Sequence, residues 1–81
     1  MVTKERTYLS KARYAKDYSL RRTAMKAGMA LQHYAKVESG QRGDRVSFMM
    51  MIRIAKALDL SLYYMATEEE KYQKEINKDY F

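Results

Sequence analysis

The sequence predicts a small all-α domain, and three features of its composition support that prediction. The 81 residues contain no proline, so no pyrrolidine ring interrupts a helix. Alanine, lysine, arginine, methionine and leucine, which all favour helices, are frequent. The three glycines, Gly28, Gly40 and Gly43, mark the few positions where helices can be punctuated. A chain of this length forms one domain with a modest core, which gains stability from a partner subunit.

The first two helices are predicted from apolar positions that recur every three or four residues. One covers residues 4–16, with Leu9 on its inward face. The next covers residues 20–27 behind Ser19, a residue type that caps helix N-termini well. Gly28 follows its last residue, as glycine commonly does past a helix C-terminus. A glycine-containing turn is therefore expected there.

Three further helices follow the same logic. The third covers residues 31–39 and is followed by a glycine. The fourth covers residues 48–58, with Ser47 as its N-cap. Ser61 then caps a short fifth helix over residues 62–66. Together these segments predict a bundle of five short helices.

A last helix is predicted from a capping box. Thr67 is followed three residues later by Glu70, a pattern in which each side chain bonds the backbone amide of the other residue. The acidic run over residues 68–70 also suits the positive end of a helix dipole. We therefore expect a separate extra helix from residue 67 to about residue 79.

The charge of the chain is unevenly distributed. Residues 1–46 carry a formal charge of +7 and residues 47–81 a charge of −1, which together make the net +6. A basic N-terminal half suggests contact with a polyanion, and a nearly neutral C-terminal half suggests contact with protein. A solvated basic face on an ordinary small protein would show the same excess, so charge alone does not decide the partner.

The composition argues against several classes of protein. The absence of cysteine excludes a disulfide framework, a thiolate zinc site and a cysteine nucleophile. One histidine, no glycine-rich phosphate loop and no paired carboxylates outside residues 68–70 argue against an enzyme, a metal site or a cofactor. No apolar run resembles a signal peptide or approaches the roughly 20 residues of a membrane span. We expect a cytoplasmic protein without membrane contact.

The segment from Ser19 to Gly40 carries the functional signal. A helix of about eight residues, a glycine turn and a second short helix have the spacing of a helix-turn-helix, whose second helix enters the major groove of DNA. Ala24 suits the close crossing of the two helices. Gly28 suits a turn position with positive φ.

These residues resemble the phage repressor and Cro type of helix-turn-helix regulator, also called the Xre family. The match covers about residues 9–66 and continues through the block from Ile54 to Leu62. It implies a compact five-helix repressor-like DNA-binding domain over residues 1–66, with helix-turn-helix helices at about 20–27 and 31–39. The matching positions before that block are Ser19, Ala24, Ala27, Gly28, Met29, Tyr34, Val37, Glu38 and Gly40.

Some positions depart from the family pattern. Leu20 stands where a phosphate-binding glutamine usually opens the first helix of the motif, and Arg22 stands at a position that is often acidic. Thr23 and Ala12 are smaller than the expected leucines, whereas Tyr34 is larger than the usual isoleucine. We expect these changes in volume to compensate one another in the core.

The third helix is expected to read bases. Tyr34 and Val37 define its buried side, so a rotation of about 100° per residue puts Gln32 and Lys36 on the opposite face. Glutamine can bind adenine, and lysine can bind guanine. The resemblance places base readers at Leu31, Gln32 and Lys36. His33 lies on the flank and is a further candidate.

Phosphate contacts are expected at both ends of the motif. Arg21 and Arg22 lie in the first turn of its first helix, while Arg42 and Arg45 lie in the loop after its second helix. In relatives, an arginine on the first helix of the domain pairs with a glutamate at the end of the base-reading helix. The resemblance therefore implies a structural ion pair between Arg13 and Glu38.

The C-terminal tail, residues 67–81, is expected to contact a protein. A single small module reads few base pairs, so a homodimer on palindromic double-stranded DNA is expected. The alternative is an antitoxin or adaptor that mainly binds a second protein through this tyrosine-rich tail. Aromatic and methionine side chains are typical of interfaces, and the candidate dimer or partner contacts are Tyr64, Tyr72, Ile76, Tyr80 and Phe81.

Overall fold

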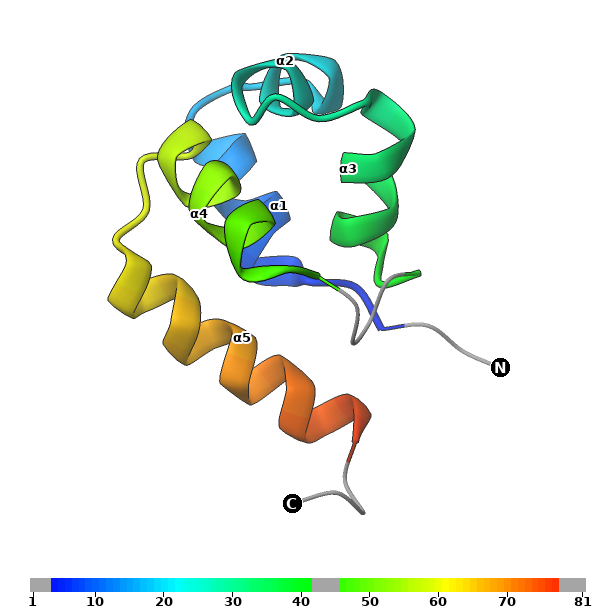
Figure 1. The fold of residues 1–81 in the computed structure, drawn as a ribbon, viewed down its shortest axis with the longest axis vertical. Helices are drawn as coiled ribbons and strands as arrows, with labels where there is room; N and C mark the ends of the chain where they lie inside the picture. The colour runs from blue at the N-terminus through cyan, green and yellow to red at the C-terminus, as the bar shows by residue number, and fades with distance from the viewer. Residues whose placement is uncertain (1–3, 42–45, 78–81) are drawn as a thin grey trace.

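The computed structural model describes residues 4–41 and 46–77, and within these ranges the chain is helical without strands. Figure 1 shows α1, α2, α3 and α4 gathered around a common centre, with α5 crossing below them. The all-α fold is confirmed. The helices are α1 (Thr7–Ala15), α2 (Leu20–Lys26), α3 (Leu31–Ser39), α4 (Phe48–Ala57) and α5 (Leu62–Ile76).

Serine side chains start three of the five helices. The hydroxyls of Ser19, Ser47 and Ser61 each accept a hydrogen bond from the backbone amide three residues later, at 3.0, 3.2 and 3.0 Å. Each bond satisfies one of the amides that a helix N-terminus leaves without a helical partner. The three predicted serine N-caps are thus present.

Left-handed backbone conformations end the first four helices. Gly28 and Gly40 follow α2 and α3 with φ of 66° and 89°, and Asp17 and Asp59 follow α1 and α4 with φ of 58°. After three of these helices, the next amide bonds the carbonyl five residues back, which closes the last turn. These bonds run from Tyr18 to Arg13, from Met29 to Ala24 and from Leu60 to Ala55.

The predicted break at Thr67 is absent, because α5 is one helix of 15 residues. The Thr67 hydroxyl donates to the carbonyl oxygen of Tyr63 at 2.9 Å, a bond within the helix, and caps nothing. The sequence from residue 62 to residue 76 contains no glycine or proline that would end the helix. Alanine and glutamate, which lie on either side of Thr67, both favour a continuous helix. The expected extra helix is therefore the second half of α5.

One core lies between the helices. Tyr34 and Thr23, the two unusual core residues of the motif, are both fully buried. The Thr23 hydroxyl donates to the Ser19 carbonyl at 3.0 Å, so its burial leaves no unpaired hydroxyl. The other large, fully buried apolar side chains come from α1, α3, α4, the residue after α4, and α5, and they are Leu9, Val37, Ile54, Leu58 and Met65.

Gly40 and Gly28 provide a matched test of backbone packing. A Cβ on Gly28 would meet no atom within 4 Å, whereas a Cβ on Gly40 would overlap the Lys4 carbonyl group. Both positions have positive φ, so Gly28→Ala should cost about 1 kcal/mol of unfolding free energy from backbone strain alone. Gly40→Ala should cost at least roughly twice that, since the clash adds to the strain. Urea denaturation of both variants measures the difference, and equal costs would contradict the packing described here.

Candidate nucleic-acid interface

The two helices of the motif lie at an angle to each other, joined by a short turn (Figure 1). Ala24 of α2 and Ala27, the C-cap residue that follows it, each have 2% of their surface exposed, so small side chains occupy the inward side of this segment. Tyr34 and Val37 of α3 are fully buried against the same core. The outer face of α3 is thereby turned to solvent.

The candidate base readers divide into two groups by exposure. Gln32 and Lys36 are exposed and one helical turn apart, as the rotation along α3 predicts. Leu31 and His33 are half-buried at the start of the helix. Nε2 of His33 is covered by protein and has no hydrogen-bond partner among the described residues. His33 is therefore more buried than Gln32 and Lys36.

The basic side chains of α2 lie beside the motif. Arg21 and Arg22 are both exposed near Ser19, where a shallow hollow of the surface lies against α2. The Arg22 guanidinium lies 4.9 Å from the centre of the Tyr18 ring, and the Lys26 ammonium lies 5.4 Å from it. Tyr18 thus gathers cations on this face by their attraction to its ring. The other two predicted phosphate contacts, Arg42 and Arg45, lie outside the described residues.

A buried ion pair supports α3 from behind. Arg13 of α1 donates from Nε and Nη2 to the two carboxylate oxygens of Glu38, at 3.0 and 2.9 Å. Its third nitrogen donates to the Tyr18 carbonyl at 2.9 Å. The side chains are 8% and 11% exposed, so this two-point pair is largely out of water. The two residues paired by the family resemblance therefore do form an ion pair.

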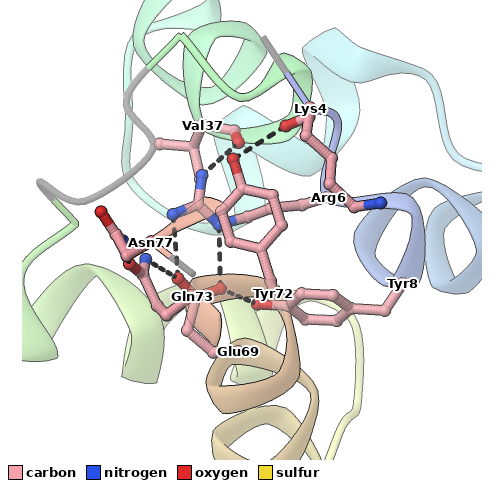
Figure 2. Close-up of polar contacts among 8 residues, drawn as sticks. All are labelled: Lys4, Arg6, Tyr8, Val37, Glu69, Tyr72, Gln73 and Asn77. Atoms are coloured by element: carbon pink, nitrogen blue, oxygen red, sulfur yellow. Dashed lines mark hydrogen bonds and ion pairs between the residues drawn. The ribbon is translucent and has the colours of Figure 1, made fainter. Parts of the chain in front are cut away.

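Sequence reasoning missed a second buried arginine. Arg6 has no exposed surface, and its guanidinium donates from Nε and Nη2 to the Glu69 carboxylate, at 2.9 Å each. Nη1 donates to the carbonyl oxygen of Val37 in α3, at 2.8 Å (Figure 2). Burial raises the pKa of Glu69, but the hydrogen bonds from Arg6, Tyr8 and Gln73 outweigh it and hold the pKa below its ordinary value. Arg6 fell within the helix predicted over residues 4–16, as one of several basic residues, and nothing in the local sequence marked it as buried. In the structure α1 begins at Thr7, and Arg6 precedes it.

Tyr72 was predicted to contact a partner subunit or a second protein, but its side chain lies inside the monomer. Only 5% of its surface is exposed, because its ring packs against the Arg6 guanidinium at 4.3 Å and its hydroxyl donates to the Lys4 carbonyl at 2.8 Å. Its aromatic surface is used within the monomer. Ile76 is half-buried, Tyr64 is 45% exposed, and Tyr80 and Phe81 lie outside the described residues.

Apolar side chains remain exposed at the starts of α4 and α5. We call these two groups of side chains together the apolar face: Phe48 and Met49 of α4 with Leu62, Tyr63 and Tyr64 of α5, which are between 45% and 84% exposed. Within residues 4–41 and 46–77, no three histidine, cysteine or carboxylate side chains gather as metal ligands. In the same ranges, no helix has the length and hydropathy to cross a membrane.

Comparison with known proteins identifies related chains. A model of the helix-turn-helix family matches residues 9–65. The restriction-modification controller protein C.AhdI from Aeromonas hydrophila is similar, with 30% identity and a TM-score of 0.68 over 74% of this chain and 88% of that one. The clp gene regulator ClgR from C. glutamicum shares the fold at 21% identity, with a TM-score of 0.69 over 82% and 83% of the two chains. No curated protein matches the sequence.

The Arg13–Glu38 pair can be tested by a double-mutant cycle. Arg13→Met should lower the unfolding free energy by about 3 kcal/mol, because Glu38 then remains buried without a counter-charge. Adding Glu38→Leu should recover most of that loss, since two apolar side chains can replace a buried pair at little cost. Denaturation in urea at neutral pH measures the four stabilities. Additive losses would show that the two side chains are not energetically coupled.

Proposed function

Because the chain belongs to the helix-turn-helix family, we propose that it is a small DNA-binding transcriptional regulator, not an enzyme, acting as a homodimer on a palindromic operator. The observation that carries the proposal is the exposed face of α3, with Gln32 and Lys36 one turn apart over a helix anchored by Arg13 and Glu38. A rigid helix with polar side chains on its outer face is what major-groove reading requires. We further propose that it represses, including its own synthesis, in the bacterial cytoplasm.

In this proposal α3 is the recognition helix. The Gln32 amide bonds adenine at N6 and N7, and the Lys36 ammonium bonds guanine at O6 and N7. Leu31, at the start of the helix, contacts a thymine methyl group. His33 contributes a further contact from the flank of the helix. Each such contact typically makes binding to the correct base more favourable than binding to a wrong base by about 1–3 kcal/mol.

Phosphate contacts orient the recognition helix. Arg21 and Arg22 are exposed on α2 beside the motif, and Arg42 and Arg45 follow the recognition helix in the sequence. Leu20 occupies the place of the glutamine that binds a phosphate in the family. In this proposal the arginines supply that phosphate contact instead. The charge of +7 over residues 1–46 supplies the same attraction at longer range.

The apolar face supports the homodimer. Leu62, Tyr63 and Tyr64 follow one another at the start of α5 and are between 45% and 84% exposed, and contiguous exposed apolar surface often marks a protein–protein contact. Two copies joined through α5, with Tyr64 and Ile76 as contacts, would present their recognition helices to half-sites about 34 Å apart or a multiple of it. Tyr80 and Phe81 remain part of this proposal as further contacts.

The same apolar face favours one other function, that of an antitoxin or adaptor bound to a second protein. Its chemistry suits any partner with a complementary apolar surface. The two functions differ in the behaviour of the isolated chain. A regulator selects a DNA sequence by itself. An antitoxin or adaptor binds its protein partner specifically, and its isolated chain is not expected to select a DNA sequence.

Selection from a randomised duplex library tests DNA reading directly. At near-physiological salt, the wild type should retain a palindrome. Gln32→Ala and Lys36→Ala should each lose preference at one base pair of every half-site, by about 1–3 kcal/mol, because the direct base contact is gone. Recovery of no preferred sequence would overturn sequence-specific regulation.

Arg21→Ala serves as the control for these two variants. A lost phosphate contact should weaken binding to all sequences alike and should lower the slope of log affinity against log salt by about one unit. The selected sequence should remain that of the wild type. A changed base preference in Arg21→Ala would mean that the roles of α2 and α3 are assigned wrongly.

The homodimer is tested by Tyr64→Glu, which puts a charge into the proposed interface. The dimer dissociation constant should rise by about thirtyfold or more, the effect of losing a central interface contact. Tyr14→Glu makes the same change at a tyrosine of α1 that is 69% exposed, and should leave association unchanged. Sedimentation equilibrium measures both, with circular dichroism to verify folding. A monomeric wild type, or equal effects of both changes, would contradict dimerisation through α5.

A further inference from the structure

We propose that Arg6 and Glu69 are positioning residues that couple α5 to the recognition helix and thereby raise its affinity for DNA. The inference rests on the proposed function, because it assigns to α3 the reading of DNA. It goes beyond that function by assigning a DNA-binding role to residues that never touch DNA. We call the group Arg6, Tyr8, Glu69 and Tyr72 the Arg6 brace (Figure 2).

The first step is that Arg6 closes the C-terminal end of the recognition helix. The last carbonyl groups of a helix have no helical amide to accept from, and burying them without donors is costly. Nη1 of Arg6 donates to the Val37 carbonyl at 2.8 Å, and the backbone amide of Arg6 donates to the Glu38 carbonyl at 2.9 Å. The segment before α1 thus supplies donors to the final turn of α3.

The second step is that Glu69 of α5 holds the guanidinium in one orientation. Its Oε1 accepts from Arg6 Nε at 2.9 Å and from the Tyr8 hydroxyl at 2.6 Å. Its Oε2 accepts from Arg6 Nη2 at 2.9 Å and from Gln73 at 2.8 Å. A carboxylate with two donors on each oxygen has little freedom to rotate. The orientation of Arg6 relative to α3 is therefore set by α5.

The third step is that the surroundings of the brace leave little room for movement. The Tyr72 ring covers the guanidinium at 4.3 Å from its centroid, and the Tyr72 hydroxyl ties Lys4 to α5 at 2.8 Å. Gly40 lies against the same Lys4 carbonyl, so closely that no Cβ fits. The final turn of α3 is thereby packed against the chain segment that α5 holds.

The consequence concerns the base-reading face. Lys36 is the residue before Val37, whose carbonyl accepts from Arg6, so any shift of this turn moves the Lys36 side chain relative to the bases. Binding sites need their groups held to within about 0.5 Å by residues behind them. Couplings between two sites of one protein typically change affinity by about 5–150-fold. Loss of the brace should therefore weaken DNA binding even in a fully folded protein.

Glu69→Gln tests the proposal, with Glu68→Gln as its matched control. Both changes remove one negative charge from the same turn of α5, so the altered net charge alone would strengthen DNA binding equally in both. Glu68 is 25% exposed and pairs with Lys71, which is 69% exposed, so its carboxylate is not part of the brace. The probe is a duplex with one half-site of the sequence that the wild type selects. One chain then binds one duplex, and dimerisation does not enter.

We expect Glu69→Gln to bind the half-site about tenfold more weakly than the wild type, at a temperature where unfolding curves show all variants folded. Glu68→Gln should bind at least as tightly as the wild type. In proton–nitrogen spectra, Glu69→Gln should shift the backbone amides of Glu38 to Gln41, far away in sequence, while the shifts of Glu68→Gln stay within α5. A purely stabilising brace would lower the melting temperature of Glu69→Gln and leave the half-site affinity unchanged, which would overturn the proposal.

Tyr8→Phe is the milder second variant, used if Glu69→Gln does not fold. It removes one of the four hydrogen bonds to Glu69 and leaves both Arg6 contacts in place, so half-site binding should weaken in the same direction but only by about two- to threefold. Unchanged affinity in folded Tyr8→Phe, with Glu69→Gln unfolded, would also overturn the proposal. If the wild type itself selects no duplex, the proposed function fails first, and that result is distinct from a wild type that binds DNA with an affinity indifferent to Glu69.

Discussion

The last turn of α3 is held by two buried arginines, and the arrangement of the whole domain depends on that anchorage. Arg13 binds the Glu38 carboxylate, and Arg6 binds the neighbouring Val37 carbonyl together with Glu69 of α5. A guanidinium suits this place because its donors form a rigid planar fork that can satisfy several oxygens at once. The carbonyl groups of Val37 and Glu38 at this helix end thereby have donors inside the domain.

Short helices make such anchoring necessary. The helices α1 to α4 have 7 to 10 residues, which is below the length at which isolated helices are stable in water. Their serine N-caps and left-handed C-terminal residues define where they begin and end, but caps contribute only about 1 kcal/mol each. Burial against the shared core and the two ion pairs hold them in place. The outer face of α3 can then carry polar residues that contribute nothing to stability.

The helix α5 serves two sides of the molecule. Its Glu69 and Tyr72 face inward and complete the Arg6 brace, whereas Leu62, Tyr63 and Tyr64 at its start belong to the apolar face. One continuous helix thereby joins the surface proposed for a partner subunit to the end of the proposed recognition helix.

The all-α class, the starts of the serine-capped helices and the turns at Gly28 and Gly40 could be predicted from the sequence, because caps and left-handed residues act within a few positions of the chain. The rotation along α3 likewise placed Gln32 and Lys36 outside, and a family resemblance was enough to pair Arg13 with Glu38. The tertiary structure alone decided that Arg6 and Tyr72 are buried and that α5 runs on past Thr67. From sequence alone, an arginine is expected at the surface and a tyrosine in such a tail at an interface. Arg6 and Tyr72 are buried instead because the fold brings them against Glu69 and Lys4, which are more than sixty positions away in the chain. Such long-range pairing leaves no periodic trace in the sequence, since it depends on where whole helices come to lie.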